Sequence, residues 1–547
     1  MEARIRKAIQ EALATLGVPD TAFTVEWPTD LAHGDFATNV ALVAAKPLGR
    51  KPQELAEELA TQLREALGDA AATVATAGPG FINITLAPTV VRADVERAAT
   101  DGEWGKGNAN IGTRIMIEYS NPNPFKQMHL GHLMGTVIGE AVSRVIENSG
   151  ATVLRDTYGG DIGPHVAKTL WALRKKEVSD VANAAEVDAA YAHGARAYEE
   201  SDEAKKEIEE LNQVLYAGAD PALMDLWHKA REVCLEAFRD LYRLLGTRFD
   251  YYLFESETTP IGMHLVEEAL ARGVFEKSEG AVIYRGEKKG LHTLVFITSH
   301  GTPTYETKDI GLAFLKEERS PSDRVYIVTG AEQIGHFKVF LAALEDIAPA
   351  LAAKTAHIAT GILRLTTGKM ASRKGNVIPA DEFIHEMIRL AAERNPDPLI
   401  AEQVGVAAVK YMILRSAPGA NIVFDPEQSL SLDGDSGPYL QYALVRAKKL
   451  LAYESESAGD VVPETPYAIE RLITRFPEVA ARAEREHAPH HIAQYLTQLA
   501  AAWNAFYATE QVLGSPEERY KQRVAHAFLN TMERGLWLLG IPAPEKM

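Results

Sequence analysis

One segment of the sequence, residues 114–154, constrains the fold more than any other. It opens with the apolar run RIMIEY, passes through a loop with two prolines, and then repeats apolar residues over 130–146 at the spacing of one helix face. Gly150 is placed to end that helix, and ATVL begins a second apolar run. A strand, a helix and a strand in this order predict a parallel strand pair with a right-handed crossover. In such sheets ligands lie beyond the carboxyl ends of the strands, against the N-terminus of the following helix.

Changes in composition along the chain predict a multidomain α/β protein. Residues 1–107 combine helical and strand-like stretches, which indicates an α+β domain, and the glycine-rich stretch 101–107 is typical of a linker. Residues 112–385 mix short β-rich runs with helices, as a parallel-sheet domain should, and a charged helical insertion is expected at about 170–245. Long amphipathic helices follow over 400–547, which predicts an all-α domain.

The composition excludes several classes of protein. Hydrophobic residues make up 46% and charged residues 24% of the 547 residues, which is ordinary globular usage and excludes a disordered or fibrous chain. Since no run of 18 apolar residues occurs and the amphipathic start lacks a secretory pattern, we expect a cytoplasmic protein without a membrane span. The one cysteine, Cys234, excludes an internal disulfide and a multi-cysteine zinc site. The net charge of −18 gives no support to nucleic-acid binding.

The tetrapeptide HLGH, residues 129–132, falls at the expected helix N-terminus. Free backbone N–H groups and the helix dipole favour phosphate at this position, and His129 and His132 lie on one side of the helix, where they can donate to phosphate oxygens. Gly131 lets a flat base approach the backbone closely. The alternative is that the histidines only cap the helix. The strand and the proline loop directly before them favour the functional interpretation.

A second polar motif, GKMASRKGN at 368–376, follows some 240 residues later. Its three cations and one hydroxyl in a glycine-bounded loop suit a clamp on a triphosphate, where charge develops as pyrophosphate leaves. Taken alone, such a run is usually a solvated loop. Its pairing with HLGH favours the nucleotide interpretation.

Together the two motifs resemble the signature motifs of class I aminoacyl-tRNA synthetases, and other stretches narrow the resemblance to arginyl-tRNA synthetases. In the catalytic region these stretches are EYSNPN, YGGDIG, GTPTYETKD and GAEQIGH. HGDFATNVAL and GPGFINITL resemble the family's extra N-terminal domain, and SGPYLQYA with the closing RGLWLLGIPAPEKM resembles its helical anticodon-binding domain. The resemblance implies a class I Rossmann-like catalytic domain at 112–385, between a tRNA-contacting domain and an anticodon-binding domain.

The resemblance implies an arginine–tRNA ligase. In this family ATP and L-arginine give arginyl-adenylate and pyrophosphate, and the arginyl group then moves to the 3′-terminal adenosine of tRNA(Arg). No covalent enzyme intermediate forms, so the residues work by positioning and by stabilising charge. We expect Mg²⁺ only with ATP, because no carboxylate cluster in the sequence suggests an ion held by the protein. The family expectation is a monomer.

The resemblance also implies which residues bind arginine. Glu118 and Asp309 hold the guanidinium with Tyr305, and Asn123 and Gln333 orient the amino and carboxyl end. Chemistry agrees, because a guanidinium needs carboxylates in planar geometry. Without the resemblance, Asp309 would be interpreted as an ordinary surface acid of a helix and Tyr305 as a core aromatic residue.

By the same resemblance, ATP is bound by residues of both signature motifs. His129 and His132 contact the phosphates, Gly131 packs under adenine, and residues of the second loop complete the site, namely Lys369, Met370 and Lys374. His336 is expected near the nucleotide, although a structural histidine is the alternative.

The sequence departs from the family pattern at Ser372, where the usual motif has a second lysine. In arginyl enzymes without that lysine, a lysine just before the histidine motif is thought to compensate, and Lys126 is in that place. We therefore count Lys126 with the catalytic residues. Whether Lys126 or Lys374 replaces the missing lysine is left open.

For RNA contact, the helical segment with Tyr439, Gln441 and Arg446 can stack on bases and bind phosphate. The alternative is packing within the helical core. The nucleotides that are read and the need for tRNA in adenylate formation are not indicated by the sequence.

Three competing functions were weighed. Another class I adenylyltransferase would need neither terminal domain. A cysteinyl or methionyl enzyme would usually show cysteine zinc ligands, which one cysteine cannot provide. A catalytically inactive RNA-binding relative would be expected to lack the histidine pair or the lysines of the second motif, and both are present.

Overall fold

The computed structural model describes residues 1–178, 180–366, 378–453 and 459–547. The chain divides into two compact units. The first comprises residues 1–106, 442–482 and 495–535, and the second comprises residues 107–441, 483–494 and 536–547. The domain boundaries expected from the sequence stay a prediction.

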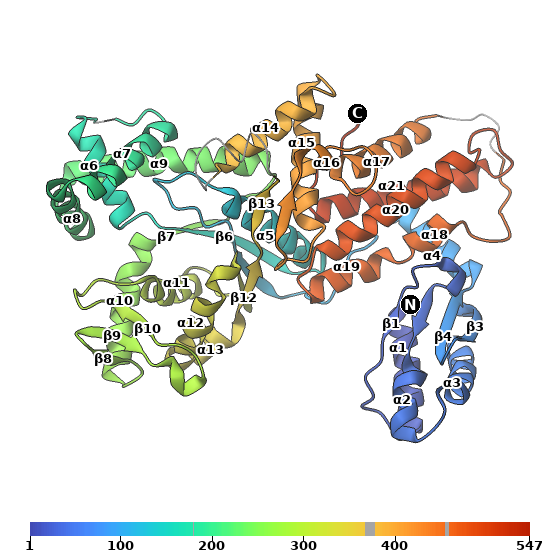
Figure 1. Ribbon diagram of the computed structural model, residues 1–547. Coiled ribbons are helices and arrows are strands. Elements are labelled where there is room, and N and C mark those ends of the chain that lie inside the picture. Colours follow the sequence, from blue (N-terminus) through green and yellow to red (C-terminus); the bar gives the residue numbers. More distant parts are fainter. Residues whose placement is uncertain (179, 367–377, 454–458) are drawn as a thin grey trace. The chain divides into compact units, whose positions relative to one another are not determined.

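In the first unit, a four-stranded antiparallel sheet in the order β1-β2-β4-β3 packs against helices (blue in Figure 1). Apolar residues of α1 recur at helical spacing, so that Ile5, Ile9 and Leu13 share one buried core with Leu55 and Leu59 of α3. The elements are α1 (Glu2–Thr15), β1 (Val25–Glu26), η1 (Leu31–His33), β2 (Phe36–Thr38), α2 (Val40–Leu48), α3 (Pro52–Leu67), η2 (Gly68–Ala70), β3 (Ala71–Ala77), β4 (Phe81–Leu86) and α4 (Pro88–Thr100).

From residue 437 on, the described residues are mainly helical, which confirms the helical C-terminal domain that the sequence predicts. Within the first unit, Trp503 of α20 stacks on Phe528 of α21 with 4.5 Å between the ring centroids. Four of these helices contribute residues to both units. The elements are α17 (Gly437–Leu451), α18 (Ala468–Ile473), α19 (Phe476–Arg485), α20 (His490–Thr509) and α21 (Glu518–Leu538).

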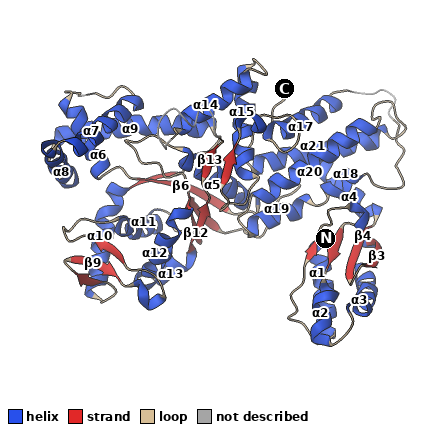
Figure 2. Cartoon of the chain, in the orientation of Figure 1, coloured by secondary structure: helices blue, strands red, loops and turns tan. Residues whose placement is uncertain are grey.

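The second unit contains a five-stranded parallel sheet in the order β12-β11-β5-β6-β7 (Figure 2). Its strands β5 and β6 are joined by α5, which confirms the predicted crossover. Glu118, the last residue of β5, lies opposite Asp156 of β6 in the strand register. The elements are β5 (Arg114–Glu118), α5 (Leu130–Asn148), β6 (Thr152–Gly159), β7 (Tyr251–Phe254), β11 (Arg324–Gly330) and β12 (Thr355–Thr360).

Helices and a small antiparallel sheet fill the connections between these strands. Four helices separate β6 from β7, namely α6 (Pro164–Lys175), α7 (Ala184–Glu200), α8 (Asp202–Ala217) and α9 (Pro221–Leu244). Between β7 and β11 lie α10 (Glu255–Ala271), β8 (Glu276–Ser278), β9 (Ala281–Tyr284), η3 (Gly286–Lys289), β10 (Leu294–Ile297) and α11 (Tyr305–Arg319), and β8, β9 and β10 form one sheet. Before β12 lie η4 (Ala331–Gln333), α12 (Ile334–Ile347) and α13 (Pro349–Lys354).

One strand lies in the region after residue 400 that the sequence predicts to be wholly helical. Strand β14 (Ile422–Phe424) pairs in parallel with β13 (Leu363–Leu365). Three residues are too few for a periodic pattern, and the strand exists because a distant partner pairs with it. The neighbouring helices are α14 (Ala380–Ala392), α15 (Pro398–Leu414) and α16 (Pro426–Ser429).

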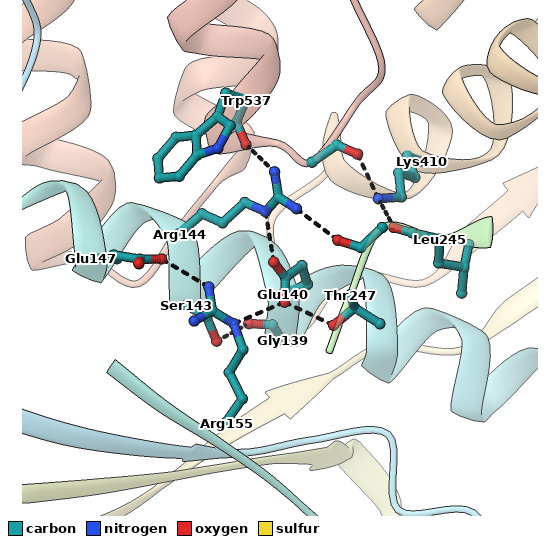
Figure 3. A network of polar contacts seen from close by, with 12 residues as sticks. Gly139, Glu140, Ser143, Arg144, Glu147, Arg155, Leu245, Thr247, Lys410 and Trp537 are labelled. Carbon is teal, nitrogen blue, oxygen red and sulfur yellow. Dashed lines mark hydrogen bonds and ion pairs between the residues drawn. The ribbon is translucent and has the colours of Figure 1, made fainter. Parts of the chain in front are cut away.

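A buried polar network anchors α5, the helix that carries HLGH (Figure 3). The Glu140 carboxylate accepts hydrogen bonds from Tyr119 at 2.6 Å, Arg144 at 2.6 Å, Thr247 at 2.8 Å and Arg155 at 3.1 Å. These partners come from β6, α5 and the segments after β5 and α9, so one carboxylate fixes α5 against the sheet.

The same network reaches two distant segments through backbone carbonyls. Arg144 donates to Gly246 O at 2.7 Å and to Trp537 O at 3.1 Å. The buried Lys410 of α15 donates to Leu245 O and to Gly540 O, both at 2.5 Å. Burial lowers the pKa of Lys410 to about 7. These contacts tie α5 and α15 to residues 537–540 within the second unit.

Candidate functional site

A polar cleft of about 620 Å³ lies at the carboxyl ends of β5, β11 and β12. This is the place that a parallel sheet predicts for a ligand, and the volume suits a nucleotide. Backbone of the HLGH turn and of the strand ends forms its walls. The lining residues are Ser120, Asn121, His129, Leu130, Gly131, His132, Gly135, Val328–Gly330, Glu332, Gln333, Thr360–Leu365 and Ile378.

The histidine pair caps α5 and faces the cleft. His129 is the N-cap residue, and its Nδ1 accepts a hydrogen bond from the Gly131 N–H at 3.1 Å. His132 Nδ1 accepts in turn from the His129 N–H at 3.2 Å, and the two rings stack at 3.8 Å. Because Nδ1 accepts in both rings, each neutral imidazole carries its proton on Nε2. The capping role weighed as the alternative thus uses one nitrogen of each ring and leaves the other as a donor.

Desolvation favours the neutral form of both imidazoles, although His129 is itself exposed to solvent. This desolvation lowers the pKa of His129, and burial together with the neighbouring His129 and Lys126 lowers the pKa of His132 to about 3. Gly131 is required by this arrangement, because a Cβ there would lie 2.9 Å from the His129 ring. The helix start therefore offers neutral N–H donors to an anion.

Lys126 lies beside the histidine pair, half-buried, with its ammonium 5.2 Å from the centre of the Tyr191 ring of α7. Burial lowers its pKa, while the charge of Glu255 opposes that change. The side chain lies beside the histidine pair, and its role in the reaction stays a prediction. Lys369, Met370, Ser372 and Lys374 lie outside the described residues, although Leu365 and Ile378 on either side of them line the cleft.

Glu118 and Asp309, the two carboxylates expected to bind arginine, line a single small cavity of about 30 Å³. Glu118 is 3% exposed, its Oε1 accepts from Asn121 Nδ2 at 2.7 Å, and its Oε2 contacts Lys316 Nζ at 2.5 Å. Asp309 Oδ2 contacts His336 Nε2 at 2.6 Å, and burial raises the pKa of Asp309. Both carboxylates are therefore already held by a neighbouring side chain.

The other three residues expected at the arginine site differ in exposure and in the contacts that they make. Tyr305, at the start of α11, is 67% exposed. Asn123 Oδ1 accepts from the Gly160 N–H at 2.8 Å, which fixes its amide against the loop after β6. Gln333, in η4, lines the nucleotide cleft.

His336, expected near ATP, is placed by its described contacts beside Asp309 and Glu306. Burial opposes its charge, but the hydrogen bonds with these two carboxylates more than offset burial and raise the pKa of His336 to about 10. The imidazolium neutralises a carboxylate of the arginine site. Its contact with ATP stays a prediction.

The loop between β5 and α5 is held in a costly conformation. Ser120, Asn121 and Phe125 have φ values of 74°, 51° and 70°, in the left-handed region that non-glycine residues rarely adopt. Asn121 bridges the loop to both strands, since its amide donates to Glu118 and accepts from the Tyr158 N–H at 2.9 Å. Strain of this kind persists only where surrounding contacts enforce it.

Sequence reasoning missed Lys316 and Asp156, which are both buried beside Glu118. A signal for Lys316 exists, because it follows Tyr305 and Asp309 at helical spacing on the same helix. Asp156 could be found by placing β6 in register with β5. Lys308, which pairs with Glu255 at 2.5 Å, was also missed.

The residues expected to contact RNA lie on α17 and differ in exposure. Gln441 is fully buried, and its amide donates to Gln403 O at 3.2 Å and Pro542 O at 2.9 Å, so the structure gives it the packing role. Arg446 is half-buried, donates to Asn504 at 3.0 Å and lies 4.0 Å over the Tyr507 ring. Tyr439 is half-buried.

Within the described ranges, no group of three or more histidine, cysteine or acidic side chains could hold a metal ion. None of the helices in those ranges combines the length and the apolar character that crossing a bilayer requires.

The parallel sheet, the cleft at its carboxyl end and the histidine pair at a helix N-terminus define the catalytic domain of a class I synthetase. The family model described as "tRNA synthetases class I (R), catalytic domain" matches residues 96–425. "Arginyl tRNA synthetase N terminal domain" matches 3–86, and "DALR anticodon binding domain" matches 440–547.

Whole-chain relatives agree with the family models. The chain is 31% identical over 549 residues to an arginine–tRNA ligase of Bdellovibrio bacteriovorus, covering 95% of this chain and 92% of the relative. It is 30% identical over 583 residues to that of Treponema pallidum, covering 99% of each. The structure of Thermus thermophilus arginyl-tRNA synthetase superposes with a TM-score of 0.82 at 27% identity over 99% of both chains. The chain belongs to the arginyl-tRNA synthetase family.

An enzyme of this family is an arginine–tRNA ligase, which charges tRNA(Arg) with arginine at the expense of ATP. This confirms the recognition, the fold class and the activity that the sequence predicts, together with ATP, arginine and tRNA as its ligands.

Proposed function

We propose that the two sides of the site divide the adenylation reaction between them. The Glu118 and Asp309 carboxylates bind the guanidinium of arginine, while the turn with His129 and His132 binds the phosphates of ATP. The arginine carboxylate then attacks the α-phosphorus, pyrophosphate leaves, and arginyl-adenylate forms. The terminal ribose hydroxyl of tRNA(Arg) next attacks the activated carbonyl, and AMP leaves.

The observation that carries the arginine assignment is that Glu118 and Asp309, from different elements, line one cavity. Charge supports it further. Around this cavity the acids outnumber the cations, so a further cation is attracted. The acids are Glu118, Asp156, Asp309, Glu306 and Glu317, and the cations are Lys316, His336 and Lys354. A guanidinium also offers paired N–H donors to carboxylates, which an ammonium cannot match.

For ATP, the proposal is supported by the two neutral imidazoles, which can donate through Nε2, and by the positive end of the α5 helix dipole. Lys126 supplies a cation on the same side and takes over the charge of the lysine that Ser372 replaces. Tyr305, Asn123 and Gln333 orient the rest of the arginine. Lys369, Met370, Lys374 and His336 are proposed ATP contacts on the resemblance alone.

On family membership we also infer that Mg²⁺ arrives with ATP, and that the enzyme acts as a monomer in the cytoplasm. Tyr439 and Arg446 stay candidate tRNA contacts, and residues 1–107, 112–385 and 400–547 the proposed domains. Light scattering of the purified protein tests the monomer.

Arginine-dependent ATP–pyrophosphate exchange, measured with and without tRNA and with each other amino acid, tests the proposed reaction. Among the amino acids, only arginine should support exchange, and only when tRNA is present. Exchange without tRNA would keep the specificity and remove the requirement for tRNA. No exchange from folded protein under any condition would contradict the proposal.

A further inference from the structure

Lys316 is a buried cation directly behind the arginine site. Its side chain is 4% exposed, and its Nζ lies 2.5 Å from Glu118 Oε2 and 2.8 Å from Asp156 Oδ2. Glu118 and Asp156 are register partners on the adjacent parallel strands β5 and β6. Two buried carboxylates that flank one ammonium group repel each other, and the cation between them offsets this repulsion.

We propose that Lys316 is a positioning residue for arginine recognition, which holds the Glu118 carboxylate toward the guanidinium. The inference rests on the proposed function, in which Glu118 binds the guanidinium. Lys316 itself need not touch the substrate, because it contacts one oxygen of Glu118 and leaves lone pairs on both oxygens for further donors.

The geometry of α11 supports this role. Tyr305, Asp309 and Lys316 follow one another at intervals of four and seven residues, so they lie along one side of the helix. Lys316 also lines the cavity that Glu118 and Asp309 share. Helix α11 thus carries two proposed arginine ligands, Tyr305 and Asp309. It also carries Lys316, which fixes the third proposed ligand, Glu118.

The electrostatic surroundings show why the charge of Lys316 matters. On β6, Asp156 faces Glu118, and Tyr158 lies near it. On α11, Asp309 adds a further acid. On β12, burial lowers the pKa of His357 to about 4, so this histidine is neutral.

His336 pairs with Asp309 and Glu306, which leaves Lys316 as the cation in contact with Glu118 among the described residues. Burial raises the pKa of Asp156 to about 6, even though Lys316 opposes that change. Without Lys316 the pKa of Asp156 would rise further, and a proton held on Asp156 would compete with the guanidinium for the carboxylate beside it.

The test is the KM for arginine of Lys316→Met in the exchange assay with tRNA present. We expect the KM for arginine to rise about tenfold or more, because a buried carboxylate loses its ion-pair partner, while the KM for ATP changes by less than about twofold. The arginine KM of the variant should also fall as the pH rises from 7 to 8.5, as the carboxylate pair releases its proton. The wild-type value should stay nearly constant over that range.

Two rescue variants separate positioning from a merely structural role. Lys316→Arg keeps the cation and should restore most of the arginine KM. Lys316→Met combined with Asp156→Asn removes the competing carboxylate together with its proton, and should recover part of the affinity and lose the pH dependence. Lys316→Gln keeps a donor without the charge, and it replaces the Met variant if that variant does not fold.

An unchanged arginine KM in folded Lys316→Met or Lys316→Gln overturns the inference. So does a raised KM without pH dependence and without recovery in the double variant, which would assign Lys316 to stability alone. Glu118→Gln is measured in parallel. If that variant keeps the wild-type arginine KM, the proposed function of Glu118 is wrong; if it loses affinity while the Lys316 variants do not, only the present inference fails.

Discussion

The cavity wall with Glu118 and Asp309 and the helix start with His129 and His132 prepare for ligands of opposite charge in different ways. At the wall, each carboxylate is already paired with a cationic side chain, Glu118 with Lys316 and Asp309 with His336. At the helix start the imidazoles are neutral, and they cap the helix with Nδ1. A cation is thus met by carboxylates that already contact a cationic side chain, and a polyanion by neutral donors.

The difference teaches where single substitutions act most strongly. Removing one member of a buried ion pair leaves its partner uncompensated, whereas removing a neutral donor loses one hydrogen bond. We therefore expect the arginine side to be the more sensitive of the two.

Asp309→Asn should have the largest effect. The variant lacks a carboxylate for the guanidinium, so kcat/KM for arginine should fall by about 10²-fold or more, with the KM for ATP nearly unchanged. Glu318→Gln, an exposed acid on the same helix, serves as the matched control. Equal losses for arginine and ATP would erase the contrast between the two regions.

His132→Ala should lower the exchange rate by about 10²-fold, because a preorganised donor to the developing phosphate charge is lost. The KM for arginine should change little. The matched control is His264→Ala, an exposed histidine of α10. An arginine KM that rises with the loss of rate would show that the helix start also serves the amino acid.

Lys126→Ala should reduce adenylate formation by about tenfold, since one cation near the phosphates is removed, with circular dichroism unchanged. Lys176→Ala, an exposed lysine of the same unit, is the control. A near-normal rate would refute compensation for Ser372 by Lys126 and assign that role to Lys374.

The smallest effect concerns the pH dependence of stability. Burial lowers the pKa of His132 to about 3, so below about pH 6.5 the unfolded chain takes up a proton that the folded chain does not, and stability falls. For His336 burial acts in the same sense, but its carboxylate partners raise the pKa to about 10, so its contribution is fully present below about pH 6.5 and is lost as the pH rises to 10.

Urea unfolding at pH 8 and pH 5 measures both effects. Between pH 8 and pH 5, the free energy of unfolding should drop by about 1–2 kcal/mol less in His132→Gln than in wild type. In His336→Gln it should drop by about 1–2 kcal/mol more than in wild type. Parallel behaviour of the two variants would contradict the opposite charge states.

Local patterns were enough to predict the parts of the site that lie on continuous elements. The apolar spacing of 130–146 and the runs beside it predict β5, α5 and β6, because burial of one helix face and of two strands is written into neighbouring residues. The cleft then follows from the topology. Which carboxylate binds which group of the substrate needed the family resemblance.

Features that depend on distant partners could not be predicted. Strand β14 is three residues long and exists through β13, nearly sixty residues earlier. Lys316 resembles any helix lysine until β5 and β6 bring two acids to it. Gln441 was expected at RNA because its helix carries tyrosines and an arginine, yet carbonyls at residues 403 and 542 bury its amide.

Lys410 bears on the order in which the chain can complete its fold during synthesis. Its ammonium needs Leu245 O, made 165 residues earlier, and Gly540 O, made 130 residues later. When Lys410 emerges from the ribosome, only the first acceptor exists, and a buried amine with half its partners favours an open, hydrated arrangement. The second unit therefore closes late, after the intervening helices have been made.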